Sequence, residues 1–527
     1  MSPRVYNIVF HTHTISGIII SVLLYVIFFT GTLSFLRDEI NAWERNEPIA
    51  EGYFERIDFD RTLKQLEAET QLYSRDINFS QRFFERRITT FMSPPKDTTL
   101  QKEARQGGRR RNFFYLDTEE FTKRDYTGNY SMGELFYRLH FFAPLNFYSI
   151  SGYYLAGLVS LLFLFAVVTG IIVHWNKIVS AFFVFRPGAK WKTIWTDAHV
   201  ALGVIGLPYQ FMFAFTGVYF IVGYSVMLAP VKDFLFDGNA DKMNESMVYE
   251  KRPDYPFEGK PLEKTVSYNT YIVQARDKWP DMEINGMQLI NYGDANMHVK
   301  VMGVPSYNDA LSGGGYVTYR VSDNIAVDEK DPYGDTPYIQ ASSNLLARLH
   351  FGDFGGYGMK IIYLVLGFIT CFVILSGVMI WLVARDKKNV SSSKRTFNTW
   401  LVHIYMAVCL GMYPVTAFTF ITVKLFADDF PDDRKGFIYT VFFWSWLVLA
   451  LLLLLKRNTG FTNRATLFLG GALGLLVPVA SGIKTGNWPW ISLSAGYSQI
   501  FVVDIFWISL SVIAFAVLLK MRKKTGT

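Results

Sequence analysis

Long apolar segments separated by polar ones dominate the hydrophobic pattern of this chain. A helix needs about 20 apolar residues to cross the hydrocarbon core of a bilayer. Eight segments reach this length, near residues 14–36, 153–175, 199–226, 359–384, 400–425, 437–455, 465–483 and 500–520. The pattern predicts a polytopic α-helical membrane protein with about eight transmembrane helices. We expect the first segment to be an uncleaved anchor, because it is long enough to span and has no small-residue cleavage site.

Two long polar segments, 37–150 and 227–355, interrupt the apolar pattern, and each is large enough for a small domain. Each has a helix-like stretch, at 59–70 and 262–279, followed by strand-like pieces at 87–91, 113–116, 283–290 and 315–320. We therefore expect two small α+β domains. The predicted organisation is a first helix at 1–36, a domain at 37–150, helices at 151–226, a domain at 227–355, a fourth helix at 356–390 and a four-helix extension at 391–527.

The distribution of charge predicts the orientation of the chain. Basic residues gather in four places, at 177–192, 385–395, 456–464 and 520–524, whereas the loop after the fifth segment is more acidic. Because lysine and arginine collect in cytoplasmic loops, both termini are predicted to be cytoplasmic and both polar segments external. The same rule accounts for the formal net charge of +7 without a nucleic-acid partner.

The two halves of the chain repeat each other. His13, Gly17 and Thr30-Gly31 in the first apolar segment recur at the same offsets as His199, Gly203 and Thr216-Gly217 in the third. Arg138-Leu139-His140-Phe141 before the second segment recurs as Arg348-Leu349-His350-Phe351 before the fourth. The second and fourth segments also share an end, Thr169-Gly170 against Ser376-Gly377. A parallel repeat of this kind predicts a pseudo-two-fold axis along the membrane normal, with sites near the repeat interface.

Seven of the eight histidines lie at or near the predicted helix ends, and four of them recur as repeat-equivalent pairs. A single interfacial histidine is most simply explained by contact with lipid headgroups. Pairs at equivalent positions call for another reason, because polar groups at membrane depth are costly. His13 and His199 are expected at the cytoplasmic level, and His140 and His350 at the external level. A two-fold axis would bring each pair face to face, as in a haem ligated by two histidines.

Other metals suit this pattern less well than haem. Zinc usually recruits cysteine or further ligands close by, and non-haem iron usually takes a carboxylate. The first four apolar segments contain no Asp or Glu, and the only cysteines are Cys371 and Cys409, both within apolar segments. His298 lies in a strand-like stretch, and we interpret it as a surface or turn residue.

His174 and His403 fall outside the symmetric pairs. The repeat counterpart of His174 is Trp381, and the glycines that follow His13 and His199 do not follow His403. Both histidines belong to the expected cytoplasmic level. Either one is a candidate to replace a ligand of the inner pair, or the two together to form a third site.

These motifs resemble the PepSY-associated transmembrane family, which includes bacterial inner-membrane ferric-siderophore reductases. The resemblance covers roughly residues 1–390 and rests on the His-to-Gly patterns, the two Arg-Leu-His-Phe segments and two external segments that look like PepSY modules. It implies two b-type haems in a four-helix core, an inner one ligated by His13 and His199 and an outer one by His140 and His350. It also implies reduction of ferric chelates in the periplasm. His174, His403 and the last four helices depart from that pattern and leave open a third haem, a quinone site or a role in docking a partner.

The function expected from the sequence is therefore that of a haem-containing electron carrier, a membrane-bound ferric-chelate reductase. No loop on the predicted cytoplasmic side is long enough for a nucleotide or flavin domain, so electrons are expected from a membrane quinol or a separate reductase. Two alternatives remain. One is a transporter of iron, haem or a siderophore, in which Pro208 kinks the third helix. The other is a non-catalytic scaffold whose external modules bind peptides.

Overall fold

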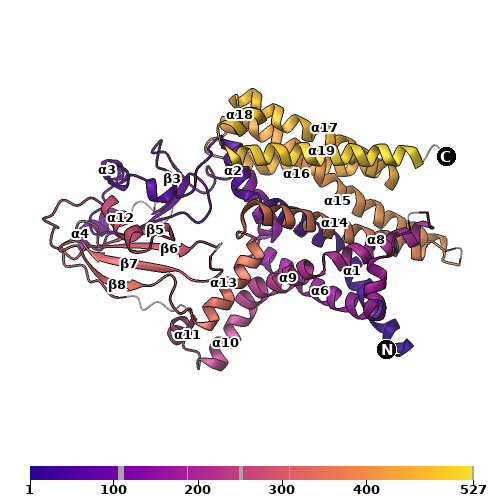
Figure 1. Ribbon diagram of the computed structural model, residues 1–527, viewed down its shortest axis with the longest axis horizontal. Helices are drawn as coiled ribbons and strands as arrows, with labels where there is room; N and C mark the ends of the chain where they lie inside the picture. The colour runs from indigo at the N-terminus through magenta and orange to yellow at the C-terminus, as the bar shows by residue number, and fades with distance from the viewer. Residues whose placement is uncertain (105–111, 187, 248–252, 308, 388, 525–527) are drawn as a thin grey trace.

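A bundle of long helices carries an antiparallel sheet at one end (Figure 1). The computed structural model describes residues 1–104, 112–186, 188–247, 253–307, 309–387 and 389–524. Within these ranges eight helical segments are long and apolar enough to span a membrane, which confirms the predicted polytopic helical membrane protein. They are Pro3–Ser34, Ser151–His174, Leu207–Leu235, Gly356–Arg385, Ser392–Asp429, Arg434–Lys456, Thr459–Thr485 and Ser498–Met521.

Helices from both halves of the repeat form one core of the bundle. Its members are α1 (Pro3–Ser34), α6 (Ser151–His174), α8 (Trp191–Ile205), α9 (Leu207–Val218) and α14 (Gly356–Arg385). Within the halves α1 packs on α6 and α8 packs on α14, and across the halves α1 packs on α14 and α6 on α9. Equivalent pairs of helices therefore make equivalent contacts, as a parallel repeat requires.

The third predicted segment is interrupted. The helix α8 ends at Ile205 and is capped by Gly206, and α9 begins at Leu207 with Pro208 in its first turn. Proline is tolerated there because the first helical N–H groups have no partner within the helix. The chain continues through the π-helix η6 (Tyr219–Met227) into α10 (Leu228–Leu235). His199 thus lies on a separate helix before the apolar span rather than at its beginning.

His140 and His350 also lie on short helices of their own, not on the second and fourth spans. They belong to α5 (Met132–His140) and α13 (Tyr338–Phe351). The Ser131 hydroxyl caps α5 by accepting a hydrogen bond from the Glu134 N–H at 3.1 Å. Gly352 ends α13 in the left-handed region with φ 62°, a conformation that favours glycine. Residues with positive φ, Phe142 and Gly352, separate both helices from the spans that follow them.

The two polar segments share one sheet. Its strands follow the order β4-β3-β2-β1-β5-β6-β7-β8, and every neighbouring pair is antiparallel. Their bounds are β1 Ile77–Ser80, β2 Arg87–Met92, β3 Phe113–Asp117, β4 Lys123–Arg124, β5 Met282–Ile290, β6 His298–Pro305, β7 Gly315–Arg320 and β8 Ile325–Lys330. The halves meet where Ile77 of β1 pairs with Leu289 of β5. The two predicted α+β domains are thus joined along their edges.

Helices α3 (Phe59–Glu69) and α12 (Asn269–Lys278) contribute to the core beneath this sheet. Phe59 and Tyr271 are buried there with the strand residues Phe79 and Val317. The sequence prediction began the second of these helices seven residues too early. The prediction that His298 is a surface or turn residue was also wrong. This residue lies in β6, is 3% exposed and stacks on Tyr255 with ring centroids 3.8 Å apart.

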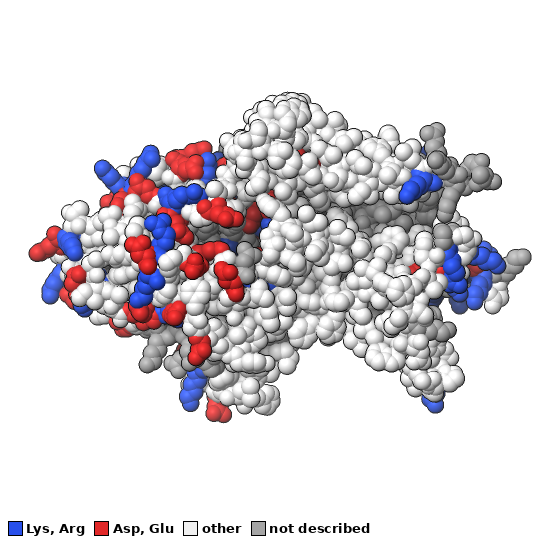
Figure 2. Space-filling model, in the orientation of Figure 1, with Lys and Arg blue, Asp and Glu red and all other residues white. Residues whose placement is uncertain are grey.

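Short helices complete the two polar segments and the loops of the bundle. They are α2 Arg37–Arg45, η1 Phe54–Arg56, α4 Thr98–Ala104, η4 Ala143–Leu145, η5 Trp175–Lys177, α7 Ile178–Phe182 and α11 Ala240–Met247. On the face shown in Figure 2, charged side chains gather over the sheet, a broad band of uncharged residues covers the helices, and basic side chains reappear at the opposite end. The helix α1 begins and α19 (Ser498–Lys524) ends at that opposite end (Figure 1). This distribution is that of a membrane protein with one large water-exposed region.

The C-terminal extension is docked on the core through buried charges. It comprises α15 (Ser392–Phe426), η7 (Ala427–Asp429), α16 (Arg434–Lys456), α17 (Thr459–Thr485), α18 (Pro489–Ser494) and α19. Arg434 at the start of α16 forms an ion pair with Glu44 of α2, and their side chains are 4% and 0% exposed. The Asp504 carboxylate of α19 accepts a hydrogen bond from the Trp43 indole N–H of α2 at 2.8 Å.

We expect Arg434→Met to destabilise the protein by about 3–5 kcal/mol, because it leaves the buried Glu44 carboxylate without its partner. Denaturant titration of the purified protein measures this change. The double variant Glu44→Gln/Arg434→Met removes both charges and is expected to recover a large part of the loss. A single Arg434→Met variant as stable as the wild type would show that this ion pair does not hold the extension.

Candidate functional site: two facing histidine pairs

His13 of α1 and His199 of α8 face each other at the end of the bundle opposite the sheet. Their ring centroids are 6.5 Å apart and the ring planes meet at 74°. Each ring is held by the neighbouring helix of its own half. The His13 Nδ1 lies 2.9 Å from the Ala166 carbonyl oxygen of α6, and the His199 Nδ1 lies 2.9 Å from the Val373 carbonyl oxygen of α14. The two contacts are equivalent under the repeat.

The repeated pairs Thr169-Gly170 of α6 and Ser376-Gly377 of α14 contact these two rings. The hydroxyls of Thr169 and Ser376 lie 3.3 and 3.1 Å from the Nδ1 atoms of His13 and His199. A Cβ placed on Gly170 or on Gly377 would be 3.3 Å from the Cε1 atom of the corresponding histidine. Both positions are therefore tight, and glycine lets each imidazole lie directly on the helix.

His140 of α5 and His350 of α13 form a second pair nearer the sheet. Their ring centroids are 5.9 Å apart and the planes meet at 48°. The His140 Nδ1 lies 2.8 Å from the Ile27 carbonyl oxygen of α1, and the His350 Nδ1 lies 2.7 Å from the Thr216 hydroxyl of α9. A Cβ on Gly31 would lie 2.4 Å from the His140 Nδ1, so only glycine leaves room for this ring.

The hydrogen bonds define the protonation of these rings. A carbonyl oxygen only accepts, so Nδ1 of His13, His140 and His199 carries the proton. The Thr216 hydroxyl donates to the Met212 carbonyl at 2.7 Å, so it accepts from the His350 Nδ1–H. Among the described residues none forms a hydrogen bond with Nε2 of any of these four histidines. The Nε2 lone pairs are thus available to a ligand.

Burial keeps the second pair neutral. Desolvation lowers the pKa of His140, and desolvation together with the nearby His140 lowers the pKa of His350 to about 3. Both imidazoles are therefore uncharged at neutral pH, which is the form that binds a metal ion.

The spacing of both pairs suits two imidazoles on opposite sides of one metal ion. With metal–nitrogen bonds of about 2.0 Å and the ring centre roughly 1 Å behind each nitrogen, the two ring centroids would be about 6 Å apart. In the described part of the chain no group of three or more His, Cys, Asp or Glu side chains is placed to share a metal. Each pair offers two nitrogen donors, so the remaining ligands of a metal would have to come from a non-protein group.

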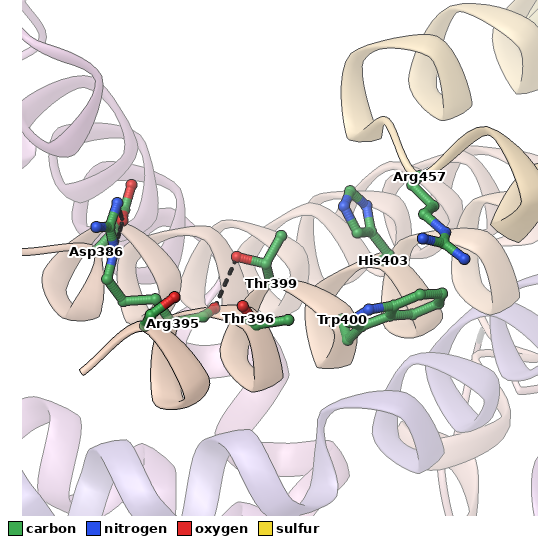
Figure 3. Close-up of a pocket in the computed structure, with 8 residues that line it drawn as sticks. Asp386, Arg395, Thr396, Thr399, Trp400, His403 and Arg457 are labelled. Carbon is green, nitrogen blue, oxygen red and sulfur yellow. Dashed lines mark hydrogen bonds and ion pairs between the residues drawn. The ribbon is translucent and has the colours of Figure 1, made fainter. Parts of the chain in front are cut away.

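Of the other two candidate histidines, His403 lies apart from both pairs, whereas His174 lies close enough to His13 and His199 to interact with them electrostatically. His174 ends α6 and lines a cavity of about 230 Å³ with residues that include Asp197 and Val200. His403 lines a separate cavity of about 520 Å³ on α15 (Figure 3), and its ring contacts Trp400. Among the described residues neither histidine makes a ring contact with one of the four paired histidines. The structure thus brings together His13 with His199 and His140 with His350, and leaves His174 and His403 single.

The partners of Nδ1 were not predicted from the sequence, although one signal for them is present there. The repeated Thr169-Gly170 and Ser376-Gly377 ends had no assigned role, and they prove to support the inner pair. The role of Thr216 had no comparable signal, since its repeat counterpart Thr30 donates its hydroxyl proton to the Val26 carbonyl and holds no histidine.

Comparisons with known proteins agree with this architecture. A family model described as the PepSY-associated TM region matches residues 10–384, which include both histidine pairs. An uncharacterised protein of Pseudomonas aeruginosa, PA4219, is 22% identical over 268 residues, which cover 49% of this chain. The match spans 65% of the length of that relative.

Proposed function

Because this chain belongs to the PepSY-associated transmembrane family, we propose that each histidine pair holds one haem b and that the protein carries electrons across the membrane to ferric chelates. The observation that supports this most strongly is the geometry of the pairs. The ring centroids are 6.5 and 5.9 Å apart, every Nδ1 is anchored, and every Nε2 is free of hydrogen bonds to described residues, so both imidazoles of a pair could hold one haem.

The residues of both pairs are suitable for binding haem b. Neutral imidazoles are suitable ligands for haem, and a hydrogen bond from Nδ1 fixes the ring orientation and makes the other ring nitrogen a stronger donor. His13 and His199 would hold the inner haem, and His140 and His350 the outer haem. Gly31, Gly170 and Gly377 lack a side chain, so the imidazoles can lie close to the helix backbone at these positions. His174 and His403 are not paired, so we propose two haems rather than three.

The bound haems would supply one-electron redox chemistry, and the chain supplies position. Along α1, His13 and the Ile27 carbonyl that holds His140 are 14 residues apart, or about 21 Å at 1.5 Å per residue. With one histidine pair near each side of the membrane, an electron would cross the apolar layer in shorter transfers than with a single site. Phe28, Phe163 and Phe213 pack on one another in the buried core beside the outer pair, and the Phe213 ring lies 5.0 Å from that of His350.

The direction of electron flow follows from the proposed orientation. We place the protein in the bacterial inner membrane, with both termini cytoplasmic and the sheet in the periplasm, because the basic loops lie opposite the sheet (Figure 2). Electrons would enter at His13 and His199 from a quinol or a separate reductase. They would leave at His140 and His350 to a ferric siderophore or another ferric chelate bound near the sheet.

Proteoliposomes test this function. A membrane-impermeant reductant is enclosed, a ferric chelate is added outside, and the ferrous iron formed is followed with a coloured ferrous chelator. We expect reduction with the wild type and none above empty liposomes with His13→Ala. His11→Ala is a matched control, because it removes an exposed histidine two residues away. Equal rates for empty and protein-containing liposomes would contradict the proposal.

Thr216→Val tests the support of the outer site. It removes the hydrogen-bond acceptor of the His350 Nδ1–H, and loss of such a partner typically weakens metal-site affinity by about 10–100-fold. We expect faster loss of one haem to an apo-haem acceptor and a changed reduction potential for that haem, while the other is unaffected. Thr30→Val is the repeat-equivalent control, and the same effect there would argue against the assigned role of Thr216.

A further inference from the structure

One face of α15 is polar for three turns before the helix becomes apolar. The side chains on this face are three or four residues apart, so they lie along one side of the helix. They line a cavity of about 520 Å³ and are Ser392, Arg395, Thr396, Thr399, Trp400 and His403. Asp386, just after α14, and Arg457, between α16 and α17, complete its wall (Figure 3).

The two arginines of this cavity differ in their partners. Arg395 is paired with Asp386, with Nη2 and Oδ1 2.7 Å apart. Arg457 lies over the Trp400 ring, 4.7 Å from its centroid, and in the described part of the chain it has no carboxylate partner. A stacked guanidinium uses its face, which leaves the N–H groups of its edge free for a planar or tetrahedral oxyanion.

His403 adds a second unsatisfied group beside Arg457. Its ring lies 6.5 Å from that of Trp400, and none of the described residues forms a hydrogen bond with it. Figure 3 shows the His403 ring and the Arg457 guanidinium on the same side of Trp400. Two potential donors therefore border the same space, and no acidic group of the cavity other than the already paired Asp386 competes for it.

The cavity lies where phosphate groups are abundant. It sits at the end of the bundle opposite the sheet, where α15 passes from polar to apolar residues, and tryptophan is enriched at such membrane interfaces. Basic pockets between membrane helices bind anionic lipid headgroups, and arginine binds phosphate through two parallel hydrogen bonds.

We propose that the cavity formed by Arg457, His403 and Trp400 binds a phosphate group, presented by an anionic phospholipid or by a soluble phosphate compound. The Arg457 guanidinium supplies the charge and two hydrogen bonds, the His403 ring supplies a further hydrogen bond, and Trp400 holds the guanidinium in place. This site is independent of the haem proposal, because it shares no residue with the two histidine pairs.

Native mass spectrometry of the delipidated full-length protein tests the site. The probes are dioleoylphosphatidylglycerol, dioleoylglycerol with the same chains and no phosphate, and inorganic phosphate as a competitor. We expect saturable binding of the phosphatidylglycerol and at least about a tenfold loss of affinity in Arg457→Gln, the size of a charge-assisted hydrogen bond. His403→Gln is expected to weaken binding less. Lys456→Gln is the matched control, since it removes an equal charge one residue away and outside the cavity.

The results distinguish a phospholipid from a soluble compound as the source of the phosphate group. Saturable lipid binding that millimolar phosphate does not displace assigns the site to a lipid, and displacement by phosphate assigns it to a soluble phosphate compound; both support the proposal. Equal effects of Arg457→Gln and Lys456→Gln would overturn it. So would equal binding of the lipid without phosphate, or no saturable binding at all.

Discussion

Replacing His350 with alanine is expected to halve the haem bound per chain. The substitution removes one of the two imidazoles of the outer pair and leaves His140 without a partner 5.9 Å away. A haem held by a single histidine lacks one axial protein ligand and is retained poorly. Haem per protein, measured as the pyridine complex after purification, should fall from two to about one.

The remaining haem identifies the pair that was broken. The proposed reduction of external ferric chelate should stop, whereas reduction of the inner haem by an added donor should persist. His403→Ala is the control, because that histidine lies apart from both pairs, and it should retain both haems. Two haems per chain in His350→Ala would show that His350 is not a ligand of the outer haem.

Gly31→Ala is expected to have nearly the same effect without touching a ligand. The added methyl group would lie 2.4 Å from the His140 Nδ1 and 2.7 Å from its Cε1. The ring cannot remain there, so it must give up its hydrogen bond to the Ile27 carbonyl. We expect loss of the outer haem together with a destabilisation of about 1–3 kcal/mol, typical of overpacking in a closely packed core. Haem content and denaturant titration measure the two effects.

Gly17→Ala is the matched control on the same helix. A Cβ at Gly17 meets no atom within 4 Å, so the substitution should leave haem content unchanged. Alanine is also the better helix former. If Gly31→Ala kept both haems at wild-type stability, the outer histidine would not occupy the position described here.

Much of the architecture was predictable because it depends on local patterns. Apolar length alone located seven of the eight spans, and the third was placed at 199–226 although it lies at Leu207–Leu235. Alternation located strands such as β2 and β7 within a residue. The joining of the two polar segments was not predictable in this way. It rests on the pairing of β1 with β5, whose residues are more than 200 positions apart, and no local pattern specifies such a partner.

The histidine pairs were predictable for a different reason. The repeat placed His13 opposite His199 and His140 opposite His350, and symmetry supplied the long-range information that local patterns lack. The helices that carry them were harder to predict. The prediction placed His199 at the beginning of the third span and His140 and His350 at the external ends of the second and fourth spans, whereas all three lie on separate helices. Gly206 and Gly352 follow two of these helices, and the apolar pattern does not show where such helices end. The cavity around His403 was not predictable, because it also needs Arg457 from the loop between α16 and α17. These helices lie outside the repeat, so symmetry gives no information about their contacts.

The central claim is that two facing pairs of neutral imidazoles each hold a haem. Its most direct test is the reduced-minus-oxidised optical spectrum of the purified wild-type protein, with haem quantified per chain. We expect sharp b-type bands and two haems per chain, with low-spin signatures because two histidines would hold each haem. A colourless protein after expression with ample haem supply would contradict it.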